Sequence, residues 1–381
     1  KRQTTCIVDH PGFGPEGCPL DHQINRYREY ARGMAVVDYG LHGVLQHVDA
    51  GVLEDVPNLV DVGIPSFKAY LTYGGKLSDY DLLRVMDGIG QAGGLLAVHA
   101  ENDGMIRFLQ ERFIEAGKTA PIYHALSRPD ICEAEAVERI IQLAAVADDA
   151  PLDIVHLSTA EGLAHVRGAR ALGQRIFAET CPQYLLLDEA DYRAKDGAGF
   201  KYIMSPPARP RENQAFLWEG LQSGAIQVVA TDHCPFDLAL KQQLGGDDFR
   251  QCPGGLPGVE TRLPLLYSEG VNKGRLSLEQ FVAVTATNPA KLMGLYPRKG
   301  ALSPGSDADI VIFDPDRRVT IRNKILHHRV DYTPYEGLHV TGWPETTLVR
   351  GRVVVDHGRL LAARGYGRFI PRAPFEEHGL G

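Results

Sequence analysis

Short apolar segments alternate with longer amphipathic segments through residues 4–232. The apolar segments have the β-branched and aromatic character of strands, and they cover 4–10, 35–44, 66–73, 95–101, 152–158, 175–181 and 226–232. Their apolar residues are continuous, as in strands buried on both faces. Amphipathic segments typical of helices lie between them at 79–92, 103–117, 132–148 and 160–172. Repeated strand and helix predicts a parallel sheet, either open or closed into a barrel.

The pattern changes after a helix predicted over 277–295. Short strands with turn residues between them follow, with no helix separating them. We therefore expect a barrel over 1–296, a small β domain over 297–365, and a C-terminal tail over 366–381 that is rich in Arg, Pro and Gly and lies on the surface or on another subunit.

Composition excludes several classes of function. Hydrophobic residues make up 44% of the chain, which supports a large core, and the net charge of −8 argues against a nucleic-acid-binding surface. No apolar stretch reaches the roughly 18 residues of a membrane span. The six cysteines form no CxxC pair, so neither a zinc finger nor a disulfide framework is indicated, and a cytoplasmic location is expected. No GxGxxG follows the first strand, which argues against a dinucleotide site.

Lys68 lies in the middle of the apolar segment SFKAYLTYGG. A buried ammonium without a partner is costly, and lysine is rarely fully buried unless it is paired. The simple alternative is that the side chain extends its ammonium to solvent. A lysine in this position therefore indicates either a partner inside the fold or a chemical modification.

Polar residues fall at or near the ends of four predicted strands: Lys68, His99, His156 and Asp232. In a (β/α) barrel the chemistry lies at the carboxyl ends of the strands. Imidazole nitrogen and carboxylate oxygen are ligands for Zn²⁺ and similar ions. Taken alone, each histidine could be structural and Asp232 could cap the next helix. Together they predict a metal site.

The chain resembles the dihydropyrimidinase/hydantoinase branch of the cyclic amidohydrolases over nearly its whole length. The matching stretches come in the family's order: SFKAYLTYGG, VHAEN (98–102), VHLST (155–159), AETCPQYL (178–185), YIMSPPARP (202–210), VVATDHCPF (228–236), PGVE (257–260) and TNPAKLMGLYPRKGALSPGSDADIVIFDP (287–315). The resemblance implies an α/β fold: a (β/α)8 TIM-like barrel with the C-terminal part of a small β-sandwich domain.

The resemblance also implies the metal chemistry. It makes Lys68 a carbamate that bridges two divalent metal ions per subunit, zinc or alternatively manganese. His99 and His156 resemble ligands of the more exposed ion. Asp232 is similar to the ligand of the deeper ion and to the general base.

Substrate contacts follow from the same resemblance. Tyr73 is similar to a tyrosine that donates to the developing oxyanion, although it could be a core aromatic residue. Ser205 and Gly254 match positions that contact the substrate through the backbone, and at Gly254 many hydantoinases have asparagine. Arg209 is the one arginine near a matched motif, where it could clamp an anionic substrate or equally face solvent or a helix end. His10 and His42 match no ligand position.

The resemblance implies hydrolytic ring opening of a dihydropyrimidine or a 5-substituted hydantoin by a hydroxide that bridges the two metals. Allantoinase or dihydroorotase activity, or a non-catalytic scaffold of the same fold, are the alternatives. The expected partner is a small cyclic amide, with no nucleic acid and no membrane, and the resemblance implies a homotetramer. Family members carry a His-x-His pair at the end of the first barrel strand, and none occurs here. We therefore expect an N-terminally truncated chain.

Overall fold

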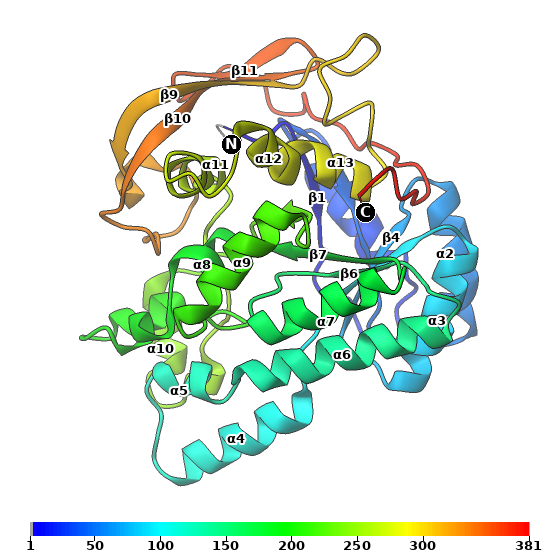
Figure 1. Ribbon diagram of the computed structural model, residues 1–381, viewed down its shortest axis with the longest axis vertical. Coiled ribbons are helices and arrows are strands. Elements are labelled where there is room, and N and C mark those ends of the chain that lie inside the picture. The colour runs from blue at the N-terminus through cyan, green and yellow to red at the C-terminus, as the bar shows by residue number, and fades with distance from the viewer. Residues whose placement is uncertain (1–2, 381) are drawn as a thin grey trace.

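A parallel sheet forms the centre of the molecule, which is a computed structural model that describes residues 3–380 (Figure 1). Its strand order is β3-β4-β5-β6-β7-β8, and every pairing is parallel. The strands are β3 (Gly43–Val44), β4 (Ser66–Tyr70), β5 (Leu95–His99), β6 (Leu152–Ile154), β7 (Ile176–Thr180) and β8 (Val228–Val229). The predicted parallel α/β core is confirmed.

A second parallel pair continues this arrangement. β1 (Cys6–Asp9) pairs with β2 (Asp38–Leu41), and β3 follows β2 directly in the chain. The single strand predicted over 35–44 is therefore divided at His42, so that its first half pairs with β1 and its second half with β4. The close approach at the break requires Gly43, because a Cβ there would lie 2.7 Å from the Phe67 ring.

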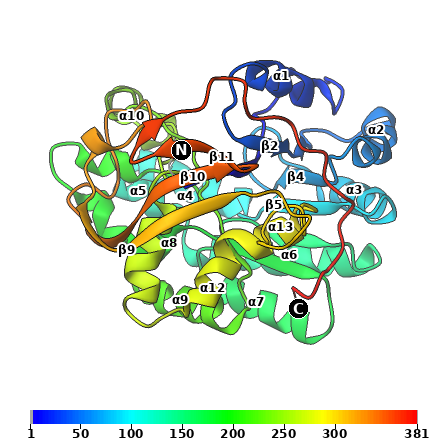
Figure 2. The same ribbon diagram turned by 90° about the horizontal axis from the view of Figure 1, so that it is seen from above.

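Helices follow the strands and pack around the sheet (Figures 1 and 2). They are α1 (His22–Ala31), α2 (Ala50–Asp61), α3 (Asp79–Gln91), α4 (Asp103–Glu115), α5 (Ile122–Leu126), α6 (Asp130–Val146), α7 (Ala160–Ala171), α8 (Pro182–Leu186), α9 (Glu212–Ser223) and α10 (Leu238–Gly245). Side chains cap the N-termini that follow the carboxyl ends of strands: Asn102 accepts from the Met105 amide, and Thr159 accepts from the Gly162 amide. These caps hold the loops that contain the strand-end residues.

The helix predicted over 277–295 is not continuous. It consists of α12 (Leu278–Val282), a π-helical turn over Ala283–Thr287, and α13 (Asn288–Leu292), while α11 (Arg262–Leu266) precedes it. Pro289 explains the change, because it has no amide N–H to bond the Thr285 carbonyl. That carbonyl accepts from the Arg262 guanidinium instead.

A four-stranded antiparallel sheet covers the end of the molecule opposite α4 (Figures 1 and 2). Its order is β12-β11-β10-β9, from β9 (Ile310–Thr320), β10 (His339–Val349), β11 (Arg352–Asp356) and β12 (Arg359–Leu360). Phe313 of β9 packs on Tyr267, with ring centroids 4.8 Å apart. The predicted small β domain is confirmed as an element of the fold, while the residue limits of the domains remain a prediction.

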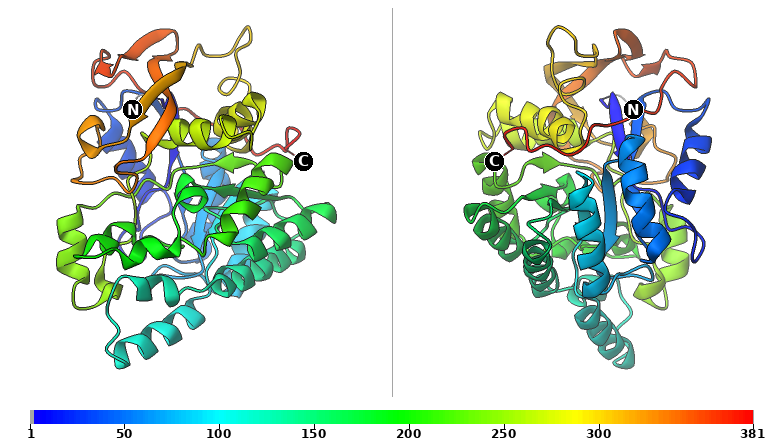
Figure 3. Two further views of the ribbon diagram at one scale, coloured as in Figure 1. Left: turned by 60° about the vertical axis from the view of Figure 1, so that its left-hand side comes forward. Right: turned by 90° about the vertical axis from the view of Figure 1, so that its right-hand side faces the viewer.

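The C-terminal segment packs along the barrel (Figure 3). Buried Arg372 donates to the Leu41 carbonyl at 2.6 Å and to the Ser66 hydroxyl at 2.7 Å. The Ala373 amide donates to the Gly294 carbonyl, and a Cβ at Gly294 would lie 2.2 Å from the Ala373 carbonyl oxygen.

Between residues 3 and 380, no helix combines the length and the apolar character needed to cross a membrane.

A buried ion cluster joins the parallel strands to the antiparallel sheet. Asp38 of β2 is fully buried, and its carboxylate bonds the Lys299 ammonium at 2.8 Å and the Arg350 guanidinium. Lys299 also contacts Asp309 at 2.7 Å. Since Asp38, Lys299 and Arg350 are far apart in sequence, this cluster fixes one part of the fold on the other.

We expect Asp38→Asn to lower the free energy of unfolding by about 1.5–3 kcal/mol, because half-buried Arg350 loses a carboxylate partner while buried Lys299 keeps only Asp307 and Asp309. Chemical denaturation followed by fluorescence measures the change. The matched control is Glu29→Gln, which removes the exposed ion pair with Arg26 and should cost less than about 1 kcal/mol. Equal, small effects of both substitutions would contradict this role of Asp38.

Candidate active site

One cavity of about 1570 Å³ opens at the carboxyl ends of the parallel strands. All seven residues predicted for the site line it: Lys68, Tyr73, His99, His156, Ser205, Asp232 and Gly254. They come from different strands and loops, as a barrel site requires.

Backbone strain gathers at this cavity. Tyr73, His156 and Asp232 have φ values of 74°, 45° and 44°, in the left-handed region that non-glycine residues seldom occupy. Each such residue costs of order 1–3 kcal/mol, and residues of this kind cluster at functional sites. The strained positions therefore support a functional role for the three side chains.

The His99 and His156 rings meet across the cavity wall. The Nδ1 atom of His99 lies 2.9 Å from the Nε2 atom of His156. Burial lowers the pKa of both imidazoles, so both are neutral at pH 7 and each offers a lone pair. Two converging nitrogens suit one shared proton or one cation.

The complete metal site is not formed by these side chains alone. Within the described chain, no three His, Cys, Asp or Glu side chains are placed to hold a metal ion. The structure thus brings the two histidines together but does not bring Asp232 into one ligand group with them. The predicted set includes a lysine, whose ammonium is not a ligand, so it would hold a cation only if Lys68 were modified.

Lys68 lies inside the sheet, in the middle of β4, and is only 3% exposed. Burial lowers the pKa of its ammonium to about 8, although the carboxylates of Asp232, Glu179 and Asp153 oppose that shift. Its Nζ atom lies 5.1 Å from the centre of the Tyr70 ring. The alternative, in which Lys68 extends its ammonium to solvent, is wrong.

Two carboxyl groups that the sequence analysis missed lie in the same interior. Asp153 of β6 and Glu179 of β7 are buried. Burial raises the pKa of both carboxyl groups, and for Asp153 the proximity of Glu179 adds to the rise. Asp153 carried the same sequence signal as Lys68, an ionisable residue within an apolar strand.

Glu101 and Arg128 form a second missed element, directly behind His99. The Glu101 Oε2 atom lies 2.8 Å from His99 Nε2 and 2.5 Å from Arg128 Nη1. Burial alone would raise the pKa of the Glu101 carboxyl, but Arg128 and His99 lower it to about 2. The carboxylate therefore stays ionised and orients the His99 ring so that Nδ1 faces His156.

Tyr73 lies between the metal-ligand candidates and the predicted substrate loops. It is 38% exposed, yet its hydroxyl is inside the cavity, where burial raises its pKa to about 12. The Arg128 guanidinium is 5.9 Å from the ring centre, which opposes the rise in the pKa. At pH 7 the hydroxyl keeps its proton and can donate it in a hydrogen bond.

Gly254 and Ser205 come from two adjacent loops. A Cβ at Gly254 would lie 3.9 Å from the Ser205 Oγ atom, an ordinary contact distance. The glycine is therefore not required by space, and a side chain could be accommodated there.

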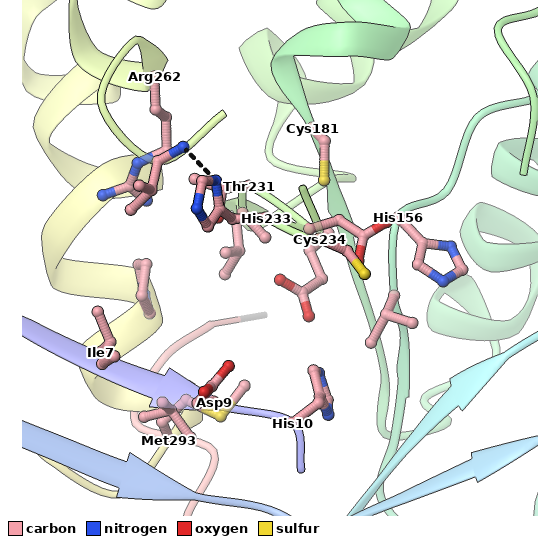
Figure 4. A pocket seen from close by; sticks show the side chains of 18 of the residues that line it. Ile7, Asp9, His10, His156, Cys181, Thr231, His233, Cys234, Arg262 and Met293 are labelled. Carbon is pink, nitrogen blue, oxygen red and sulfur yellow. Dashed lines mark hydrogen bonds between the residues drawn. The ribbon is translucent and has the colours of Figure 1, made fainter. Parts of the chain in front are cut away.

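The structure changes the interpretation of two histidines, His10 and His42, and of Arg209. His10 and His42, which match no ligand position, both line the cavity and stack with ring centroids 4.1 Å apart. Figure 4 shows Asp9 and His10 at the end of β1, across the space from His156 and Cys181. Arg209 neither faces solvent nor reaches toward the cavity; it is buried and donates to the Ser158 hydroxyl and the Arg128 carbonyl.

The fold and this site define a class of protein. The sequence matches the amidohydrolase family over residues 93–354, and the chain belongs to that family. Its parallel strands with a polar cavity at their carboxyl ends agree with this assignment.

Individual relatives show which branch of the family this chain resembles. A D-phenylhydantoinase from Escherichia coli O1:K1 / APEC is 51% identical over 372 residues, which are 98% of this chain and 80% of that protein. A crystal structure of dihydropyrimidinase from Brevibacillus agri NCHU1002 matches with a TM-score of 0.96 and 41% identity, covering 98% of this chain and 81% of that one. The L-hydantoinase (dihydropyrimidinase) from Arthrobacter aurescens matches with a TM-score of 0.87 and 33% identity, covering 97% and 81%. The resemblance to the dihydropyrimidinase/hydantoinase branch is confirmed.

We expect Glu101→Gln to weaken Zn²⁺ binding about 10–100-fold, because the neutral amide no longer holds the His99 ring as a carboxylate does. Competition with a chelator of known affinity measures this without any assay of activity. Glu115→Gln, on the exposed end of α4, is the matched control and should bind Zn²⁺ like the parent. A folded Glu101→Gln protein with unchanged affinity would show that the carboxylate does not orient the ligand.

Proposed function

We propose that this protein opens the ring of a cyclic amide by hydrolysis, with dihydropyrimidines or 5-substituted hydantoins as substrates. One observation carries the proposal: Lys68, Tyr73, His156 and Asp232 converge on one cavity, and three of them hold strained backbone there. The names of the relatives agree with it, including a D-phenylhydantoinase at 51% identity. Allantoinase and dihydroorotase activities and a non-catalytic scaffold are not favoured.

The residues present fit a pair of divalent cations in their chemistry. Lys68, as a carbamate, would bridge the pair, while His99 and His156 would hold one ion and Asp232 the other. When bound, such ions polarise a ring carbonyl and lower the pKa of a coordinated water toward about 7. Formation of the carbamate needs the neutral amine, which burial of Lys68 favours.

The side chains then perform the proton transfers. Asp232 accepts the proton of the attacking water and returns it to the ring nitrogen as the C–N bond breaks. Tyr73 donates a hydrogen bond to the oxygen that becomes negative when the carbonyl carbon turns tetrahedral. The high pKa of the tyrosine keeps the donor protonated throughout.

The cavity is suited to a neutral ring. Among residues 3–380, each arginine that lines it has a partner of its own: Arg107 with Asp103, Arg128 with Glu101, Arg250 with Asp248, and Arg262 with the Val229 carbonyl. A substrate with an exocyclic carboxylate would need a guanidinium that is free to pair. Backbone groups near Ser205 and Gly254 would bind the ring amide instead.

Finer properties belong to the same proposal. The ions are zinc, Lys68 is carbamylated, and the protein works as a homotetramer in the cytoplasm. The resemblance to the hydantoinase branch supports zinc, the carbamate and the tetramer, and the cysteine pattern without a disulfide framework supports the cytoplasmic location.

A substrate comparison tests the proposed function. We expect the zinc-loaded protein to hydrolyse dihydrouracil, hydantoin or 5-phenylhydantoin with a larger kcat/KM than dihydroorotate, since none of the described arginines that line the cavity is free to pair with the carboxylate. Loss of ring amide absorbance measures each reaction. A larger kcat/KM for dihydroorotate, or hydrolysis of none of the four compounds, would overturn the proposal.

Tyr73→Phe and Lys68→Ala distinguish the proposed hydrogen-bond donor from the residue proposed to hold the metals. Tyr73→Phe should keep the bound metal and lower kcat about 10²–10³-fold, because it removes only a donor to the transition state. Lys68→Ala should lose metal and activity together. Elemental analysis beside turnover checks both, and equal metal loss in the two variants would contradict the assigned roles.

A further inference from the structure

Lys241 of α10 is a fully buried lysine without a carboxylate partner in the described part of the chain. Its exposed fraction is 0%, and its ammonium donates to the Ile203 and Gly255 carbonyls, each at 2.8 Å. The Tyr332 hydroxyl, at 3.4 Å, is a third and weaker partner. Burial lowers the pKa of the ammonium to about 8. A lysine is seldom buried in this way, so the position calls for a role beyond packing.

The two carbonyls belong to the two loops that carry the proposed substrate contacts. Ile203 precedes Ser205 by two residues, and Gly255 follows Gly254 directly. The loops also touch each other, because the Gly255 amide donates to the Ile203 carbonyl at 3.0 Å. The Lys241 ammonium therefore lies where the loops meet and bonds to both.

The Gly255 loop is pressed against the segment that follows Asp232. Gly255 has a φ of 144°, which residues other than glycine rarely adopt. A Cβ at Gly255 would lie 2.2 Å from the Cys234 carbonyl oxygen. The Cys234 amide donates to the Leu256 carbonyl at 3.1 Å. One side of this loop is thus fixed relative to Asp232, and its other side depends on Lys241.

The helix that carries Lys241 is itself held at its start. The Leu238 amide at its start donates to the Asp331 carboxylate at 2.7 Å, next to Tyr332. The lysine therefore extends from an anchored helix, which limits how far the two carbonyls can separate.

We propose that Lys241 is a positioning residue that sets the spacing between the Ser205 loop and the Gly254 loop, and so sets the affinity for the ring amide. The effect on affinity for the ring amide rests on the proposed function, whereas the effect on loop spacing does not. Lys241 does not contact the cavity wall where the metal-ligand candidates lie, and it touches substrate only through the loops that it joins. Two charged hydrogen bonds to carbonyls are what hold the spacing.

Lys241→Met tests this inference, because methionine has a similar length and no donor. We expect KM for hydantoin to rise about tenfold or more, with a much smaller change in kcat and with the metal content of the parent. Lys195→Met, at an exposed position, is the matched control and should leave KM unchanged. An unchanged KM, or a loss of metal in step with activity, would overturn the inference.

Hydrogen exchange separates this inference from the proposed function. In Lys241→Met we expect faster amide exchange at 203–205 and 254–256, with the β4 and β5 amides unchanged. If neither loop changes, or if exchange rises evenly over the molecule, the positioning role is wrong even in an active enzyme. If the parent hydrolyses no cyclic amide, the proposed function fails while the exchange result still decides the role of Lys241.

If Lys241→Met does not fold, Lys241→Gln takes its place, since the shorter amide keeps donors but cannot reach both carbonyls. The same readouts apply, with a smaller rise in KM. A folded Lys241→Gln protein with the parent KM and the parent exchange rates would overturn the inference.

Discussion

Desolvation of ionisable groups inside the parallel strands is the constraint on which the site depends. Lys68, Asp153 and Glu179 are buried among the parallel strands, where little water reaches their charges. Burial pushes the pKa of the lysine down and the pKa of the two acids up, toward the neutral forms. The surrounding strands must therefore hold these groups in place, because no solvent shell stabilises them. Burying several ionisable groups together destabilises a fold, so such clusters are found mainly at functional sites.

The sequence predicted the elements that depend on local pattern. Continuous apolar segments placed the strands, and amphipathic periodicity placed α3, α4, α6 and α7 to within a few residues. The failures arise from distant contacts. The strand at 35–44 divides at His42 because its two halves pair with different neighbours, and the helix at 277–295 breaks because Pro289 removes one amide.

The candidate site also divides into residues that a local sequence pattern reveals and residues that only distant contacts bring into place. Lys68, His99, His156 and Asp232 were found from strand ends and from a family resemblance, and all of them line the cavity. Glu101, Arg128 and Lys241 could not be found in that way. Glu101 orients His99 only because Arg128, 27 residues away, pairs with it. Lys241 gains its role from two carbonyls that lie 38 and 14 residues away. Pairings across such separations are set by the tertiary fold and leave no local pattern in the sequence.

The C-terminal segment has a consequence for how the chain folds. Arg372 bonds the Leu41 carbonyl across a separation of 331 residues, and Arg350 reaches Asp38 across 312. Contacts of such range must wait for the loops between them to close, which slows folding. During synthesis, β2 cannot complete its buried contacts until residues as far along the chain as Arg372 have left the ribosome. β2 therefore waits through the synthesis of more than 300 further residues without its final neighbours, a period in which its exposed apolar side chains favour aggregation and the help of a chaperone.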